Sequence, residues 1–288
     1  MEEMILSTGR KLAFERYGDP QGTPTFYYHG WPSSRLQGEL MHETGRRLGL
    51  RVVAMDRPGI GHSDFQPGRR LLDWPPLLAE LAAHLDWEKF HVFGVSGGGP
   101  YSLVTAYGLP ERVLSVSVIC GAPPLGLLGT GQMFWPYRMV LALRHRVPWA
   151  LGPFFRAGVA MTYLRPDQRP LKWAIGLLKE QDRKVLGDGG THRIMMGGLR
   201  ESLNSGVAPL QADGDIYTSD WGFDLRDIRV PVQFWHGTDD RNIPCSYAQK
   251  VAAMVPGAIT HWTEGDGHYS LPVLRVEEIA RVALGLQG

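Results

Sequence analysis

The chain of 288 residues has little of several features that would mark a particular class of protein. It has only two cysteines, Cys120 and Cys245, which lie far apart in sequence and form no metal-ligand cluster. Free thiols in a reducing compartment are the simpler interpretation, although the spacing leaves a disulfide open. The sequence has no run of 18 uncharged apolar residues, and its first seven residues include two Glu and no Lys or Arg. We therefore expect no membrane span, no secretory signal and a cytoplasmic protein.

The sequence also lacks a large excess of charge of one sign and any histidine spacing that is typical of a metal site. The formal net charge is +1, so nothing global in the charge predicts a nucleic-acid partner. The histidines at strand or loop ends, His62, His236 and His261, lack HxH or HExxH spacing. We therefore expect no metal and no cofactor.

The sequence does have alternating strand-like and helix-like segments, and 43% hydrophobic residues, enough for a sizeable core. An opening hairpin is predicted at 4–7 and 11–17. The later strands are predicted at 24–28, 50–55, 89–94, 112–120, 230–236 and 258–263, and the helices at 34–48, 74–86, 97–108, 245–255 and 271–286. This alternation predicts the α/β class, with a mostly parallel central sheet covered by helices on both faces.

One interval breaks the alternation. Residues 123–222 contain aromatic helical stretches divided by Pro and Gly. We expect this interval to be a helical cap, or lid, inserted into a core made of residues 1–122 and 223–288.

The pattern GxSxG places Ser96 between Gly94 and Gly98, directly after an apolar run and before a helix-like segment. A tight strand-to-helix turn of this kind is typical of a nucleophile elbow, which holds a serine hydroxyl clear of the backbone. Upstream, another apolar run ends in His29-Gly30-Trp31. Acyl-transfer enzymes of this type take one oxyanion-hole amide from such a loop and one from the residue after the nucleophile.

The candidate oxyanion donors are therefore the backbone amides of Trp31 and Gly97. The Trp31 indole would then line the pocket and limit acyl size, or alternatively it packs under the cap. We expect Gly30 to support the loop and His29 to brace it by a side-chain hydrogen bond rather than to act as a second base.

An acid and a base follow downstream. Asp240 lies in a loop after the predicted strand 230–236, and His268 follows another strand-like run. Ser96, Asp240 and His268 occur in the order nucleophile, acid, base, which differs from the chymotrypsin and subtilisin orders. Asp239 is the alternative acid, but the run Gly-x-x-Asp-x-x-apolar-Pro favours Asp240.

On these motifs the sequence resembles the α/β-hydrolase superfamily over nearly its whole length, and within it the capped serine hydrolases of the esterase and proline iminopeptidase-like group. A further similarity is the DxxGxGxS loop from Asp56 to Ser63, to which the resemblance assigns a structural role. The resemblance implies a Ser-His-Asp triad that forms an acyl-enzyme with a small-molecule substrate. Esters of small to medium acyl groups are the default expectation, because they need only the triad, the hole and an apolar pocket.

Several alternatives stay open. Proline iminopeptidase-like activity would need a cap carboxylate to hold the substrate amine, and the candidates are Glu180, Asp182, Glu201 and Asp213. Carbon–carbon bond hydrolysis, hydroxynitrile lyase and perhydrolase activities would use the same residues. An alternative from a different functional class is a non-catalytic receptor that binds a small ligand on the same fold.

The cap interval is basic. Residues 125–205 hold 12 Lys or Arg against 5 Asp or Glu, a net of +7. This is either a solvated face or a surface that attracts a carboxylate-bearing substrate or an anionic surface. The sequence leaves a homodimer open.

Overall fold

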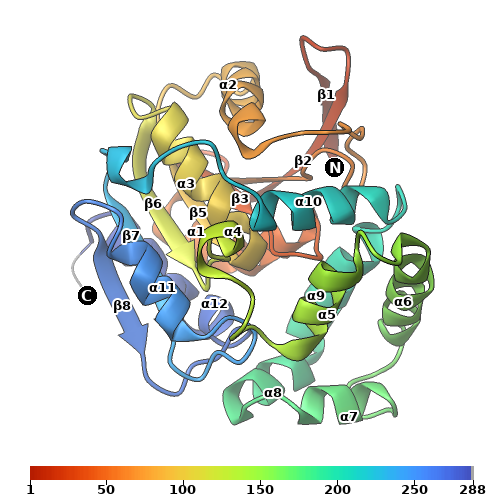
Figure 1. The fold of residues 1–288 in the computed structure, drawn as a ribbon. Coiled ribbons are helices and arrows are strands. Elements are labelled where there is room, and N and C mark those ends of the chain that lie inside the picture. Colours follow the sequence, from red (N-terminus) through yellow and green to blue (C-terminus); the bar gives the residue numbers. More distant parts are fainter. Residues whose placement is uncertain (287–288) are drawn as a thin grey trace.

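The computed structural model describes residues 1–286, and an eight-stranded sheet forms its centre (Figure 1). The strands lie in the order β1-β2-β4-β3-β5-β6-β7-β8. The pairs β1–β2 and β2–β4 are antiparallel, and the other five pairs are parallel. The strands are β1 (Glu2–Ile5), β2 (Lys11–Gly18), β3 (Thr23–Tyr28), β4 (Leu50–Met55), β5 (Phe90–Val95), β6 (Val113–Ile119), β7 (Val232–Gly237) and β8 (Ile259–Thr263). The predicted mostly parallel sheet is confirmed.

Helices cover both faces of the sheet, as predicted. One buried cluster joins β5 residues Phe90 and Val92 to the helices α2 (Trp74–His84), α3 (Gly99–Gly108) and α11 (Cys245–Ala252). The other joins Phe93 and Val95 to α12 (Leu271–Leu274) and α13 (Val276–Ala283), with α1 (His42–Leu48) packed on β2, β4 and α13. Successive strand side chains point to opposite faces, so β5 contributes to both clusters.

Two predicted helices are interrupted. The segment 34–48 begins as a 3-10 helix over Arg35–Met41 before α1, and 271–286 is divided at Arg275 into α12 and α13. Apolar spacing over one or two turns does not distinguish a 3-10 helix from an α-helix, which explains the first difference.

Seven α-helices, followed by a 3-10 helix at Leu225–Asp227, lie between β6 and β7. They are α4 (Leu125–Leu128), α5 (Trp135–Leu143), α6 (Pro148–Met161), α7 (Leu171–Gly176), α8 (Glu180–Gly187), α9 (Gly189–Glu201) and α10 (Ala208–Thr218). In Figure 1, α6 and α7 lie at the outer edge of the molecule, away from the sheet. The longest of these helices has 14 residues, and within residues 1–286 no helix is long and apolar enough to cross a membrane.

Candidate active site

Ser96 lies where β5 ends and the chain turns into α3. Its φ is +52°, in the left-handed region that a non-glycine residue rarely adopts. The turn is possible because Gly94 and Gly98 leave room. A Cβ on Gly94 would lie 1.9 Å from Ser102 Oγ, and one on Gly98 would lie 2.3 Å from the carbonyl oxygen of Tyr28. The backbone therefore has the strained strand-to-helix turn that a nucleophile elbow requires.

The three residues predicted as nucleophile, base and acid meet in space. Ser96 Oγ lies 2.9 Å from His268 Nε2, and His268 Nδ1 lies 2.7 Å from Asp240 Oδ2. The alternative acid, Asp239, lies at the surface, with Lys179 Nζ 3.7 Å from its carboxylate. The structure thus brings Asp240, and not Asp239, to the imidazole.

The surroundings of Asp240 keep it ionised. Its Oδ1 accepts hydrogen bonds from the amides of Asn242 and Ile243, at 2.8 and 2.9 Å. Burial raises the pKa of a carboxyl group, but the imidazoles of His268 and His236 outweigh burial and hold the pKa of Asp240 well below its ordinary range. Burial alone would lower the pKa of His268, but the charge and hydrogen bond of Asp240 raise that pKa above 6.5. The pair is therefore arranged to stabilise an imidazolium.

The loop after β3 lies against the elbow. A Cβ on Gly97 would lie 3.1 Å from the amide nitrogen of Trp31, so the two predicted oxyanion amides belong to adjacent backbone segments. Gly30 donates its own amide to Gln37 Oε1 at 2.6 Å, and His29 Nδ1 lies 2.8 Å from the Gly30 carbonyl oxygen. Burial, followed by the charge of Arg57, lowers the pKa of His29 well below 6.5. A neutral imidazole bonded within the loop fits a bracing role.

Trp31 combines the two roles that the sequence left as alternatives. Its side chain lines the space beside Ser96, and its indole Nε1 donates to the carbonyl oxygen of Leu210 in α10 at 3.1 Å. The Tyr217 ring, also from α10, packs edge-on against the indole, with centroids 5.9 Å apart. Tyr217 Oη donates to the Gly97 carbonyl oxygen at 3.2 Å. Sequence reasoning missed Gln37 and Tyr217, because no local motif marks either residue.

Three side chains that could bind a metal ion, Asp240 among them, lie close together. Donor atoms of Cys120, His236 and Asp240 lie within 4.8 Å of one another, in the only such group among residues 1–286. His236 Nε2 is 2.7 Å from the Ile243 carbonyl oxygen and 3.1 Å from Asp240 Oδ2. Burial raises the pKa of the Cys120 thiol well above its usual value, which favours the neutral form over the thiolate that binds metals. The donors are thus arranged for hydrogen bonding within the protein.

A cavity of about 330 Å³ opens beside Ser96 and His268. Its walls come from the elbow, the Trp31 loop and the helices between β6 and β7, and they are mainly apolar. The lining from the segment between β6 and β7 consists of Phe134, Tyr137, Leu171, Ala174, Ile175, Leu178, Leu186, Met195, Met196 and Leu199. No carboxylate, Lys or Arg is among the described lining residues, so the cavity suits an uncharged apolar group.

The four carboxylates considered as amine holders all have other partners. Glu180 is exposed and pairs with Lys184 at 2.8 Å. Asp213, fully buried on α10, accepts from the guanidinium groups of Arg57 at 3.0 Å and Arg69 at 2.6 Å. Burial raises the pKa of a carboxyl group, but these two arginines outweigh it and lower the pKa of Asp213 to about 2.

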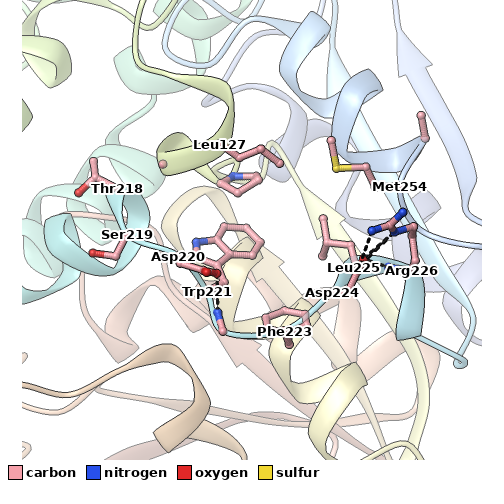
Figure 2. A pocket seen from close by; sticks show the side chains of 14 residues that line it. Leu127, Thr218, Ser219, Asp220, Trp221, Phe223, Asp224, Leu225, Arg226 and Met254 are labelled. Atoms are coloured by element: carbon pink, nitrogen blue, oxygen red, sulfur yellow. Dashed lines mark hydrogen bonds and ion pairs between the residues drawn. The ribbon is translucent and has the colours of Figure 1, made fainter.

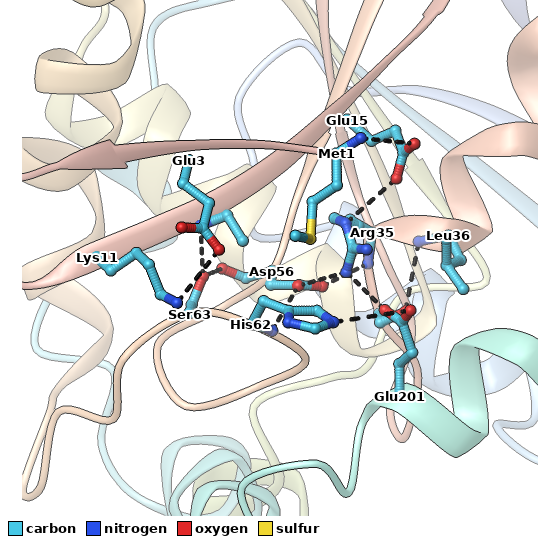
Figure 3. A network of polar contacts seen from close by, with 12 residues as sticks. Met1, Glu3, Lys11, Glu15, Arg35, Leu36, Asp56, His62, Ser63 and Glu201 are labelled. Carbon is cyan, nitrogen blue, oxygen red and sulfur yellow. Dashed lines mark hydrogen bonds and ion pairs between the residues drawn. The ribbon is translucent and has the colours of Figure 1, made fainter.

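The third of these carboxylates, Glu201, belongs to a polar network outside the cavity. Figure 3 shows Arg35 between Asp56 and Glu201; its Nη1 donates to Asp56 Oδ2 at 2.8 Å and to Glu201 Oε2 at 2.5 Å. Asp56 also accepts from the His62 amide at 3.0 Å, while Ser63 Oγ donates to the Asp56 carbonyl oxygen at 2.9 Å. The DxxGxGxS loop is thus joined to α9 through Arg35, which forms an ion pair with each.

The fourth carboxylate, Asp182, holds the loop that carries the histidine. Asp182 is 1% exposed, on α8. Its Oδ2 accepts from the His268 amide at 3.1 Å, and its Oδ1 accepts from the Tyr269 amide at 3.0 Å and from the Ser270 amide and hydroxyl, both at 2.8 Å. A Cβ on Gly267 would lie 2.4 Å from this carboxylate. No signal in the sequence links residues 86 positions apart in this way.

A second, wider hollow of about 1020 Å³ lies where the chain leaves α10 and returns towards β7 (Figure 2). Its wall includes Trp221 and Phe223, which stack with ring centroids 6.2 Å apart, and Leu127 and Met254. Ser96, Asp240 and His268 do not line it. The chemistry of the elbow therefore belongs to the smaller cavity.

Known proteins resemble this chain over most of its length. The model of the Alpha/beta hydrolase family matches residues 28–282. A non-heme chloroperoxidase of Streptomyces lividans is 26% identical, over 93% of each chain. A bifunctional esterase/perhydrolase of Acinetobacter calcoaceticus is 25% identical, over 85% of this chain and 84% of that protein.

Among solved structures, an esterase from Exiguobacterium antarcticum has a TM-score of 0.70 at 16% identity and covers 98% of this chain and 97% of its own. An esterase from a Rhodococcus species has a TM-score of 0.68 at 22% identity, with 99% of both chains covered. At these sequence identities the solved structures show the fold alone. With the family model matching most of its residues, the chain belongs to the α/β-hydrolase family.

Proposed function

We propose that this protein is a serine hydrolase that cleaves esters of small to medium acyl groups through an acyl-enzyme. The observation that carries the proposal is the chain of contacts from Ser96 Oγ to His268 Nε2, at 2.9 Å, and from His268 Nδ1 to Asp240 Oδ2, at 2.7 Å. It lies at the wall of an apolar cavity. These are hydrogen-bond distances between a nucleophile, a base and the group that orients the base.

In the proposed mechanism, His268 removes the hydroxyl proton of Ser96 as Oγ attacks the acyl carbon. Asp240 holds the imidazole and offsets its developing positive charge. The amides of Trp31 and Gly97 donate to the oxyanion, a contribution worth about 3 kcal/mol for each donor in comparable sites. His268 then protonates the leaving alcohol, and a water molecule, deprotonated by the same imidazole, hydrolyses the acyl-enzyme.

The cap, for which we propose residues 123–222, supplies the specificity. Because its contribution to the cavity is aliphatic and aromatic, we infer a neutral acyl or alcohol group there. The proline iminopeptidase-like alternative loses its support, because Asp182 accepts four hydrogen bonds from the histidine loop and Asp213 is paired with two arginines. We therefore expect that the protein does not cleave proline amides.

The test is treatment of the protein with a fluorophosphonate, followed by peptide mass spectrometry. We expect a rapid adduct on Ser96 that is absent in Ser96→Ala and strongly slowed in His268→Ala. A panel of p-nitrophenyl esters of increasing chain length then measures acyl size. No adduct, under conditions where an ordinary serine esterase reacts, would contradict the proposal and favour the non-catalytic receptor.

Perhydrolysis is a second candidate, because the similar proteins include one named as a bifunctional esterase/perhydrolase and one named as a non-heme chloroperoxidase. In this reaction hydrogen peroxide replaces water, attacks the acyl carbon on Ser96 and leaves as a peracid, while the proton returns through His268 to Oγ. Peracid formation from an ester and hydrogen peroxide, lost in Ser96→Ala, tests this candidate.

A further inference from the structure

Helix α6 is unusually apolar for a helix at the edge of a protein. Its 14 residues, PWALGPFFRAGVAM, include one charged side chain, Arg156. Of its seven exposed positions, 149, 153, 156, 157 and 160 fall at i, i+4, i+7, i+8 and i+11, which is one face of a helix, and 148 and 154 lie to either side of it. Trp149 on this face is 78% exposed, and Phe154, further along the same helix, is 42% exposed. Among residues 1–286, no segment covers this face.

The next helix continues the pattern. Trp173 on α7 is 67% exposed, and Tyr163 in the connection between the two helices is 73% exposed. We call the exposed side chains of residues 146–173 the outer cap surface. Several large aromatic side chains left in water within one segment are typical of an interaction surface rather than of a solvated one.

The same surface is positively charged. Residues 146–173 contain five Lys or Arg and one acidic residue, Asp167, a net of +4. Arg146, Arg156, Arg169 and Lys172 are exposed, and none has a carboxylate of residues 1–286 within 4.0 Å. Only Arg165 pairs with the single acid, at 3.6 Å.

A basic hollow of about 470 Å³ opens at the edge of this surface. It is lined by Arg165, Arg193 and Arg200, together with Asp167. Arg193 pairs with Glu39, but the Arg200 guanidinium has no carboxylate partner among the described residues and lies 4.9 Å above the Tyr163 ring. The hollow offers a phosphate group a cation beside the aromatic surface.

Two occupants could cover an exposed aromatic face, and charge distinguishes them. A second copy docked through the same face would bring two surfaces of net +4 together, which is unfavourable. An anionic lipid surface has the opposite charge, and the combination of Trp, Phe and unpaired Arg or Lys is the one found in segments that lie in a membrane interface. We propose that the outer cap surface docks the protein on an anionic phospholipid bilayer, with a lipid phosphate at the basic hollow.

The position of this surface suggests what the docking is for. Leu171, Ala174, Ile175 and Leu178 line the catalytic cavity, and Lys172 and Trp173 of the same segment belong to the outer cap surface. Met196 lines both the catalytic cavity and the basic hollow. This part of the inference rests on the proposed esterase function: docking would bring the cavity to esters dissolved in the bilayer.

The experiment is sedimentation of the full chain with vesicles of phosphatidylcholine alone and of phosphatidylcholine with 30% phosphatidylglycerol. We expect binding to the anionic vesicles at about 0.1 M salt, weaker binding at about 0.5 M, and little binding to the neutral ones. Equal binding to both vesicles, or to neither, would overturn the proposal. So would a dimer in light scattering that is lost with Trp149→Ser/Trp173→Ser, because a second copy would then be the occupant.

Matched variants assign the contact. Trp149→Ser/Trp173→Ser and Arg169→Glu/Lys172→Glu should each weaken binding at least about tenfold. The apolar control is Ile5→Ser/Ile259→Ser, at positions that are 66% and 51% exposed on the sheet. The charge control is Lys89→Glu/Lys250→Glu, at exposed positions outside residues 123–222.

Both controls should bind as the unmodified protein does, and an equal loss in the controls would refute the assignment. All four variants should keep the hydrolysis rate of a water-soluble ester. Vesicle binding by a protein that hydrolyses no ester would leave the docking surface intact and refute only the esterase.

Discussion

The hydrogen bonds of Asp182 predict that a cap residue sets the position of the base. We consider Asp182→Asn, which keeps the size of the side chain. The amide oxygen can still accept the three hydrogen bonds now made by Oδ1, but the amide nitrogen would face the His268 backbone amide, a donor 3.1 Å away. One hydrogen bond to a charged group, worth about 1.5–3 kcal/mol, is lost, and the other three become neutral. Because an amide costs less to bury than a carboxylate, we expect the free energy of unfolding to fall by about 2–3 kcal/mol.

The kinetic effect should be larger than a loss of stability alone would give. A displacement of about 1 Å in a catalytic group can cost about a hundredfold in rate, so we expect kcat/KM for a soluble p-nitrophenyl ester to fall by about ten- to a hundredfold. The charge of Asp182 also contributes to the raised pKa of His268. The acid limb of the pH profile of kcat/KM should therefore move to lower pH in Asp182→Asn.

The control is Asp188→Asn, the same substitution in the next helix. Asp188 accepts from the Thr191 amide at 2.8 Å and caps α9 without touching the histidine loop. Because Asn caps a helix about as well as Asp, this substitution should cost only the charge–dipole contribution, about 0.3–1 kcal/mol, and leave the acid limb unchanged. If Asp182→Asn is folded at the assay temperature and has the same kcat/KM and the same acid limb as the unmodified protein, Asp182 does not position the base.

Three further predictions concern the core of the site. The Cβ of Gly94→Ala would lie 1.9 Å from Ser102 Oγ, so urea unfolding should show a loss of about 1–3 kcal/mol together with lower activity. Asp213→Asn leaves two buried guanidinium groups without a counter-charge and should lower the free energy of unfolding by about 3–5 kcal/mol. Because the pKa of Asp213 is lowered from 3.8 to about 2, the stability that its charge contributes is present above pH 3.8 and is lost as the pH falls towards 2. Acid titration of the native fold can follow this loss. His268 must be neutral to act as a base and its pKa is raised by Asp240, so kcat/KM should fall with decreasing pH along a limb above pH 6.5, and Asp240→Asn should lower kcat by about 10⁴-fold.

Much of the sheet could be predicted from the sequence because buried parallel strands are short, continuous apolar runs bounded by turn residues. The strand predicted at 50–55 is β4 (Leu50–Met55). The strand predicted at 230–236 begins two residues later, at Val232, and ends at Gly237. Pro231 has no N–H for the ladder, although its carbonyl oxygen accepts from Val116 at 2.9 Å. The meeting of Ser96, Asp240 and His268 was also predictable, because each follows a strand at the same edge of the sheet.

The role of Asp182 could not be predicted in the same way. In sequence it lies in the polar run Glu180-Gln-Asp182-Arg-Lys, which looks like the solvated face of a helix. Charged residues are rarely fully buried unless they are paired, and three of the four partners of Asp182 are backbone amides, which have no sequence signature. As one of four candidate amine holders Asp182 has the required charge, but its carboxylate accepts hydrogen bonds from the histidine loop.

The buried carboxylates of the cap have a common consequence. Asp182 on α8 accepts from the loop of the base, and Asp213 on α10 accepts from Arg57, whose Nη1 and Nη2 donate to the carbonyl oxygens of His29 and Gly30 at 2.6 and 2.9 Å. One cap helix is thus bonded to the histidine side of the site and another to the oxyanion side. A movement of either helix that broke these contacts would leave a buried charge unpaired, which is costly. We therefore expect α8 and α10 to stay fixed to the core while substrate binds.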